Sequence, residues 1–141
     1  MPSIETRALL PADPETVFDM IQNVEDFPRY TPTVESVTPI GEQRYHWKTR
    51  VSGMVFEWDV EVTEHQRPGR LAWRSLSGIE NQGRYRLTPV PGGTDVRLTI
   101  DYSLNSRILD RTVGKMAAPM VKRISNDILA RVRQMLAAEA R

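Results

Sequence analysis

The chain has 141 residues, of which 40% are hydrophobic and 26% charged, and its formal net charge is +1. A chain of this length can bury the core of one domain, so we treat residues 1–141 as a single domain. The absence of cysteine excludes disulfides, thiolate nucleophiles and cysteine-ligated metal sites, and the near-zero charge gives no reason to expect DNA binding. No apolar run opens the chain or approaches about 18 residues, which predicts a cytoplasmic protein without stable membrane insertion.

The first part of the chain predicts one strand, two short helices and a second strand. Residues 3–10 are typical of a strand. Asp13 and Pro14 fit the N-cap and the first position of a helix. Residues 24–30 predict a short second helix or turn, and a further strand is expected near 34–40.

The middle of the chain alternates strictly between apolar and polar residues on both sides of Ser52-Gly53. Such alternation is typical of half-buried strands, and a two-residue gap containing glycine predicts a hairpin of strands 43–51 and 54–64. With this loop, Trp47 faces Trp58 on the apolar side, and cations face anions on the other side. The facing pairs of opposite charge would be Lys48 with Glu57, His46 with Asp59, and Arg44 with Glu61.

The remainder predicts three more strands and one long helix. Strands are expected at 70–77, 82–90 and 94–104, and apolar residues recur every three or four positions over 108–136. Pro119 should kink this helix or split it. The element order predicts an α+β fold in which one antiparallel, seven-stranded sheet packs against the long helix. We expect a cavity where the two short helices close the gap between these layers.

Five segments, taken in order, carry a resemblance that covers almost the whole chain. They are residues Pro11–Phe18, Val24–Tyr30, Glu57–Trp58, Ala72–Ser75 and Gly93–Val96. Together they resemble the START-related superfamily of polyketide cyclases/dehydrases and lipid-transport proteins, which has the helix-grip fold. The resemblance implies a curved sheet wrapped around the C-terminal helix and a hydrophobic ligand (polyketide, quinone or lipid-like) bound between them. Because the sequence contains no glycine-rich phosphate loop and no nucleotide motif, no cofactor is expected.

The ligand site is expected on the apolar face of the sheet and on the residues that close it. Buried tryptophan and tyrosine rings can stack on a flat ligand, and their N–H and O–H groups can orient its oxygens. The alternative, that these side chains simply fill the core, stays open. The candidate ligand-binding residues are Tyr30, Tyr45, Trp47, Thr49, Phe56, Trp58, Trp73, Ser75, Tyr85, Tyr102, Met116 and Met120.

The sequence identifies no catalytic residue. By alternation, His46 should face solvent, and Glu64 has inward parity near the mouth of the cavity. Two separated histidines without cysteine predict no metal site. The aromatase/cyclases of the resembled superfamily have Ser and Arg on the inner face where this chain has Val60 and Val62, which favours binding or carriage. If the protein is an enzyme, the resemblance implies a cyclase/dehydrase-type lyase or isomerase that uses no metal.

The C-terminal region is basic. Residues 107–141 contain eight Lys or Arg and three Asp or Glu, a net charge of +5. This allows an alternative function, in which the protein associates with ribosomes or with a membrane surface through its basic helix. A helix face that is merely solvated explains the same charges. The sequence leaves the oligomeric state open, including a homodimer.

Overall fold

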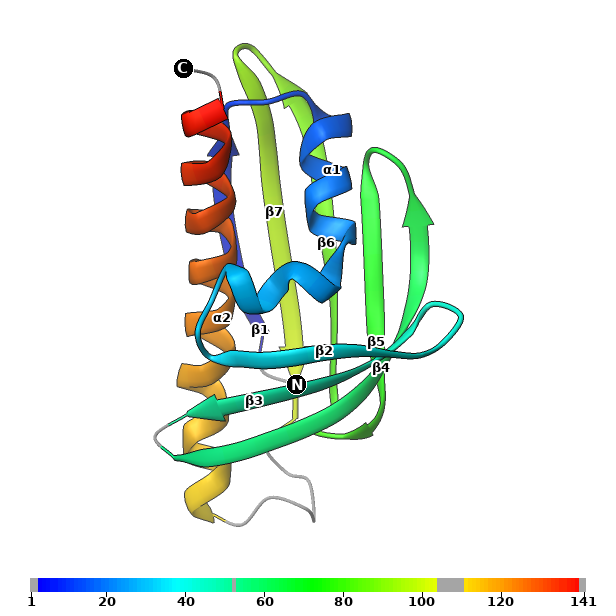
Figure 1. Cartoon of the computed structure of the whole chain (residues 1–141), viewed down its shortest axis with the longest axis vertical. Coiled ribbons are helices and arrows are strands. Elements are labelled where there is room, and N and C mark those ends of the chain that lie inside the picture. Colours follow the sequence, from blue (N-terminus) through cyan, green and yellow to red (C-terminus); the bar gives the residue numbers. More distant parts are fainter. Residues whose placement is uncertain (1–2, 52, 104–110, 140–141) are drawn as a thin grey trace.

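The computed structural model describes residues 3–51, 53–103 and 111–139, and only the backbone of 111–118 and 139. A curved antiparallel sheet of seven strands, in the order β1-β7-β6-β5-β4-β3-β2, packs against the long helix α2 (Figure 1). The predicted helix-grip fold is confirmed. The elements are β1 (Ser3–Leu10), α1 (Pro14–Gln22), η1 (Val24–Arg29), β2 (Val34–Gly41), β3 (Arg44–Val51), β4 (Met54–Gln66), β5 (Arg70–Gly78), β6 (Asn81–Val90), β7 (Gly93–Tyr102) and α2 (Arg111–Glu139).

The two short helices form where the sequence predicts them. The carboxylate of Asp13 accepts a hydrogen bond from the backbone N–H of Thr16 at 2.8 Å, which caps α1, and Pro14 occupies the first helical position. The second short helix, η1, is a 3₁₀ helix that contains Pro28 and buries Phe27. These segments cover the concave side of the sheet beside α2 (Figure 1).

The β3–β4 hairpin has the predicted register, with Trp47 opposite Trp58. Among the three expected pairs of opposite charge, His46 and Asp59 are in contact, with 2.6 Å between Nδ1 and Oδ1. Lys48 faces Glu57 and Arg44 faces Glu61 as expected, but the Lys48 ammonium lies 3.6 Å from Oε2 of Glu35 on β2. Since β3 has a neighbouring strand on each side, a long side chain can choose between two partners, and facing position alone does not decide which.

The C-terminal half agrees with the prediction to within a few residues. Residue 104, the expected last residue of β7, and residues 108–110, the expected start of the helix, lie outside the described residues. Of the two expected effects of Pro119, the split does not occur, since α2 continues through it. Pro119 lies on the exposed side of the helix, where water can replace the backbone hydrogen bond that proline cannot make.

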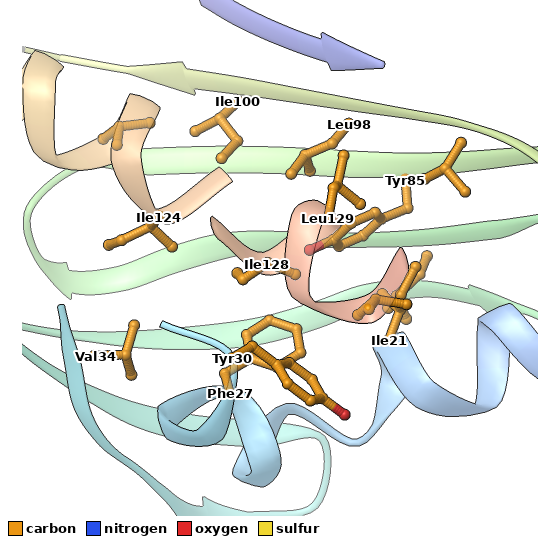
Figure 2. Close-up of a cluster of buried hydrophobic side chains, with 14 of the residues drawn as sticks. Ile21, Phe27, Tyr30, Val34, Tyr85, Leu98, Ile100, Ile124, Ile128 and Leu129 are labelled. Atoms are coloured by element: carbon orange, nitrogen blue, oxygen red, sulfur yellow. The ribbon is translucent and has the colours of Figure 1, made fainter. Parts of the chain in front are cut away.

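The core between the sheet and α2 has two ends. At one end, α1 and the last turns of α2 lie near the β6–β7 turn (Figure 1), and Phe18 of α1 and Val132 of α2 are both 0% exposed. Towards the other end, Ile124 and Ile128 of α2 face the sheet above Phe27 of η1, as Figure 2 shows. The cavity described below lies at this second end.

Candidate ligand-binding cavity

A cavity of about 80 Å³ lies between the sheet and the part of α2 from Met120 to Ile128. Its wall combines η1, strands β3 to β7 and one side of α2. The lining residues are Val24, Phe27, Tyr45, Trp47, Trp58, Val60, Val62, Leu71, Ala72, Trp73, Ile79, Asn81, Tyr85, Leu98, Ile100, Met120, Val121, Ile124, Ser125 and Ile128.

The wall is almost entirely apolar. The described lining residues include all three tryptophans of the chain but no Asp, Glu, Lys, Arg or His. Polar side chains are limited to two tyrosines, Asn81 and Ser125. A buried charge without a counter-ion is costly, so this cavity suits a neutral molecule.

Aromatic rings form one wall of the cavity. The rings of Trp47 and Trp58 stack with their centroids 6.0 Å apart and 11° between their planes, and Phe27 meets Trp47 edge-to-face at 5.5 Å. This arrangement follows from the hairpin register, which places the two indoles directly opposite each other. The indole N–H of Trp47 is buried and has no hydrogen-bond partner among the described residues.

Trp73 is held in place by β6. It lies opposite Gly83, and a Cβ added at that glycine would overlap with the Trp73 ring. The Trp73 indole N–H donates to Oδ1 of Asn81 at 3.0 Å, while the Asn81 side-chain amide donates to the Ile79 carbonyl at 2.8 Å. The backbone N–H of Asn81 donates to the Ser75 hydroxyl at 2.9 Å. Glycine thus leaves room for the indole, and the asparagine fixes its orientation.

The structure divides the twelve candidate ligand-binding residues into two groups. One group lines the cavity and comprises Tyr45, Trp47, Trp58, Trp73, Tyr85 and Met120. The other group packs elsewhere and comprises Tyr30, Thr49, Phe56, Ser75 and Tyr102, while the side chain of Met116 lies outside the described residues. Direct contact of any of the twelve with a ligand stays a prediction.

Residues of the second group have structural partners that alternation did not reveal. The Thr49 hydroxyl lies 3.2 Å from the Phe56 carbonyl and 3.3 Å from the Met120 sulfur. The Ser75 hydroxyl accepts the hydrogen bond from Asn81. Tyr30 packs on Phe27, with 5.7 Å between ring centroids. Inward position in a strand therefore does not by itself place a side chain at the cavity.

The inward parity expected for Glu64 is wrong. A register shift between Val62 and Glu64 pairs Glu64 with Ala72, which in turn pairs with the exposed Arg84 on β6, so Glu64 shares the outer side of the sheet. The following residue, His65, turns towards α1 and contacts Phe18 edge-to-face at 5.2 Å. A single extra residue in β4 reverses the parity of everything after it.

The cavity also includes residues that the sequence analysis did not select. Asn81 begins β6 directly after a turn, where no periodic signal exists, and Ser125 lies within the apolar stripe of α2. Ile124 and Ile128 follow the helical period, but periodicity does not say which turns of a helix border a cavity.

His46 lies away from the cavity, on the outer side of the hairpin, as expected. Its hydrogen bond to Asp59, together with a second contact to Glu57 at 3.1 Å, raises its pKa above the ordinary histidine value. Among the described residues, no group of three or more His, Cys, Asp or Glu is arranged to hold a metal ion. None of the described helices is long and apolar enough to cross a bilayer.

Comparisons with known proteins match this fold over its whole length. A family model described as polyketide cyclase / dehydrase and lipid transport matches residues 1–137. Solved structures with a similar fold include a Thermus thermophilus protein (TM-score 0.83, 22% identity, covering 99% of this chain and 100% of that one). A second is the Zhui aromatase/cyclase of a Streptomyces species (TM-score 0.80, 18% identity, 99% and 96% coverage).

One curated relative matches over part of its sequence. It is an uncharacterized 17.2 kDa protein of Streptomyces lincolnensis, 31% identical over 67 residues. The match covers 48% of this chain and 45% of that protein, so it spans less than half the length of the relative.

Proposed function

The chain belongs to the polyketide cyclase/dehydrase and lipid-transport family, and we propose that it binds a small, neutral, aromatic or polyketide-like molecule in the cavity between the sheet and α2. The observation that carries this proposal is the lining itself. Three tryptophans border a space that no charged side chain among the described residues enters. Clefts lined by aromatic and aliphatic groups with few polar atoms are typical sites for small hydrophobic ligands.

The volume limits the size of the ligand. An apolar cavity that binds benzene measures about 150 Å³, so the 80 Å³ cavity is roughly half that size. Pockets for drug-sized ligands usually measure about 300–1,000 Å³. A ligand of one or two rings therefore requires some lining side chains to move, and a long polyketide or a lipid chain requires larger movements.

The lining favours binding over catalysis. General acid–base chemistry needs a side chain with a suitable pKa within reach of the reacting group, and no Asp, Glu, Lys or His is found among the described lining residues. Val60 and Val62 line the cavity at the positions where the resembled aromatase/cyclases carry a serine and an arginine. We therefore favour carriage or sequestration of the ligand, without a chemical step.

Tryptophan fluorescence tests this proposal directly, because all three tryptophans line the cavity. We expect saturable quenching by one- and two-ring aromatic ketones and hydrocarbons below millimolar concentration. Ile124→Phe places a ring into the cavity and should abolish binding. Met135→Phe is the matched control, since Met135 belongs to the same helix but does not line the cavity. The absence of saturable quenching, or equal losses in the two variants, would contradict the proposal.

A second candidate function rests on the exposed cations of α2. Lys122, Arg123, Arg131 and Arg133 are exposed, and no ion pair joins them to the described residues. They could bind anionic headgroups or ribosomal RNA. Co-sedimentation with ribosomes and with anionic liposomes, at low and moderate salt, tests this. The double variant Lys122→Glu with Arg123→Glu should lose such binding, while aromatic ligands should still quench its tryptophan fluorescence. Unchanged co-sedimentation of the double variant would reject this candidate function.

A cytoplasmic location and a homodimer stay predictions.

A further inference from the structure

Two polar side chains of the cavity wall, Asn81 and Ser125, already have hydrogen-bond partners within the protein. Asn81 is engaged by Trp73 and by the Ile79 carbonyl. The Ser125 hydroxyl donates to the Val121 carbonyl, one turn earlier on α2, at 2.8 Å. Tyr45 is only half-buried and can reach water. These groups have no need of a ligand.

Four donors on cavity-lining residues have no hydrogen-bond partner among the described residues: the indole N–H groups of Trp47 and Trp58 and the hydroxyls of Tyr45 and Tyr85. The Trp47 indole N–H is buried against protein, so a ligand reaches it only if the ring rotates. Among the other three side chains, Tyr85 is the most deeply buried. Tyr85 is 4% exposed, and Figure 2 shows its hydroxyl pointing towards α2 beside Ile128, across the space between the layers.

The Tyr85 hydroxyl is not among the side-chain atoms that the described protein encloses completely, so it keeps contact with the free space of the cavity. A polar group of a cavity wall that has no partner in the protein bonds to water or to a ligand there. Tyr85 projects from β6 in the middle of the sheet, and its ring lies 5.8 Å from that of Trp73. Its position is therefore fixed by the scaffold, which suits it to orient a ligand.

Tyr85 is a neutral donor. Burial raises the pKa of its hydroxyl well above the ordinary tyrosine value, so the group keeps its proton throughout the physiological range. A neutral phenol donates a hydrogen bond to a carbonyl oxygen but removes no proton from the ligand.

We propose that Tyr85 is the specificity-determining residue of the cavity, and that its hydroxyl donates a hydrogen bond to the carbonyl oxygen of a neutral aromatic ketone. This inference rests on the proposed function, because it names the class of molecule that the same cavity holds. The carbonyl group meets Tyr85, and the hydrocarbon part of the ligand contacts the aliphatic and aromatic wall. Carboxylates are disfavoured, since no cation lines the described part of the cavity.

The test compares α-tetralone with tetralin, two bicyclic molecules that differ by one carbonyl group. Dissociation constants are measured by tryptophan fluorescence in the wild-type protein, in Tyr85→Phe and in Tyr102→Phe. Tyr102 is the matched control, because it is a buried tyrosine of the neighbouring strand β7 that does not line the cavity.

Tyr85→Phe should weaken α-tetralone binding by about two- to tenfold, the value of one hydrogen bond, and leave tetralin binding unchanged or tighter. Tyr102→Phe should change neither. Equal effects of Tyr85→Phe on both ligands, or no effect on the ketone, overturn the role of Tyr85 while leaving the proposed function intact. Failure of both ligands to bind the wild-type protein overturns both proposals.

Infrared spectroscopy provides a second readout that does not require the variant to fold. The carbonyl stretch of α-tetralone bound to the wild-type protein should lie at lower wavenumber than that of the ketone in an alkane solvent, as expected for a hydrogen-bonded carbonyl. A stretch at the alkane position shows that no donor reaches the ligand and overturns the proposal.

Discussion

The two ends of the layer between the sheet and α2 are built from the same elements but packed differently. At the end covered by α1, Phe18 and Val132 are completely buried. At the other end, Trp47 and Trp58 stack on each other, and the Trp73 ring packs against Gly83. Branched aliphatic side chains interdigitate and fill space, whereas rings held by cross-strand contacts cannot collapse into a gap. The apolar cavity thus lies at the aromatic end, whereas the free space at the other end is a hollow beside the β6–β7 turn, lined by Leu10, Pro91 and Arg133 among others.

The largest loss of stability is expected from a substitution in the core under α1. Phe18→Ala should destabilise the protein by about 3–5 kcal/mol, because it opens a new cavity among close-packed groups. Ile124→Ala should cost less, about 2 kcal/mol, since Ile124 already borders empty space and loses fewer contacts. Urea denaturation measures both values. Equal losses, or a larger loss at Ile124, would show that the two ends are packed alike.

A smaller loss of stability is expected when a methyl group is added at Gly83, which lies against Trp73. In Gly83→Ala the new methyl group overlaps with the indole, which must move, at a cost of about 1–3 kcal/mol. Tryptophan fluorescence should change because the Trp73 indole moves. Gly69→Ala is the control, because its added Cβ would meet only the Leu87 carbonyl at 3.9 Å. If both variants behave like wild type, the indole is not held against β6 as described.

The smallest effect concerns alkaline pH. Burial raises the pKa of Tyr85 in the folded state, so its contribution to stability is fully present below the unfolded pKa of about 10 and is lost as the pH rises through the folded value. The free energy of unfolding should fall by up to about 1.4 kcal/mol per pH unit above pH ~10 because of this one group. Denaturation of wild type and Tyr85→Phe between neutral and alkaline pH measures it. A slope that the variant does not reduce would mean that Tyr85 ionises freely in the folded protein.

Sequence reasoning predicted the parts of this fold that follow local rules. The Asp13 cap and the register that pairs Trp47 with Trp58 depend only on residue type and spacing, and both are found in the structure. It did not say which neighbour a long side chain contacts, as with Lys48 and Glu35, and it failed where one extra residue changes parity, as at Glu64.

The candidate site was predictable only in part for a related reason. Alternation identifies which residues face inward, but the position of the cavity depends on three-dimensional packing. Thr49 and Ser75 face inward and yet serve other protein groups. Asn81, which orients Trp73, lies at a strand start where the sequence gives no periodic signal.

The most direct test of the cavity is an NMR titration of the three tryptophan indole N–H signals with α-tetralone. Since Trp47, Trp58 and Trp73 all border the same space, a ligand in that space should shift all three signals with one common dissociation constant. Signals that stay in place, or that move with unrelated affinities, would mean that the rings pack only against one another and that the molecule binds elsewhere or not at all.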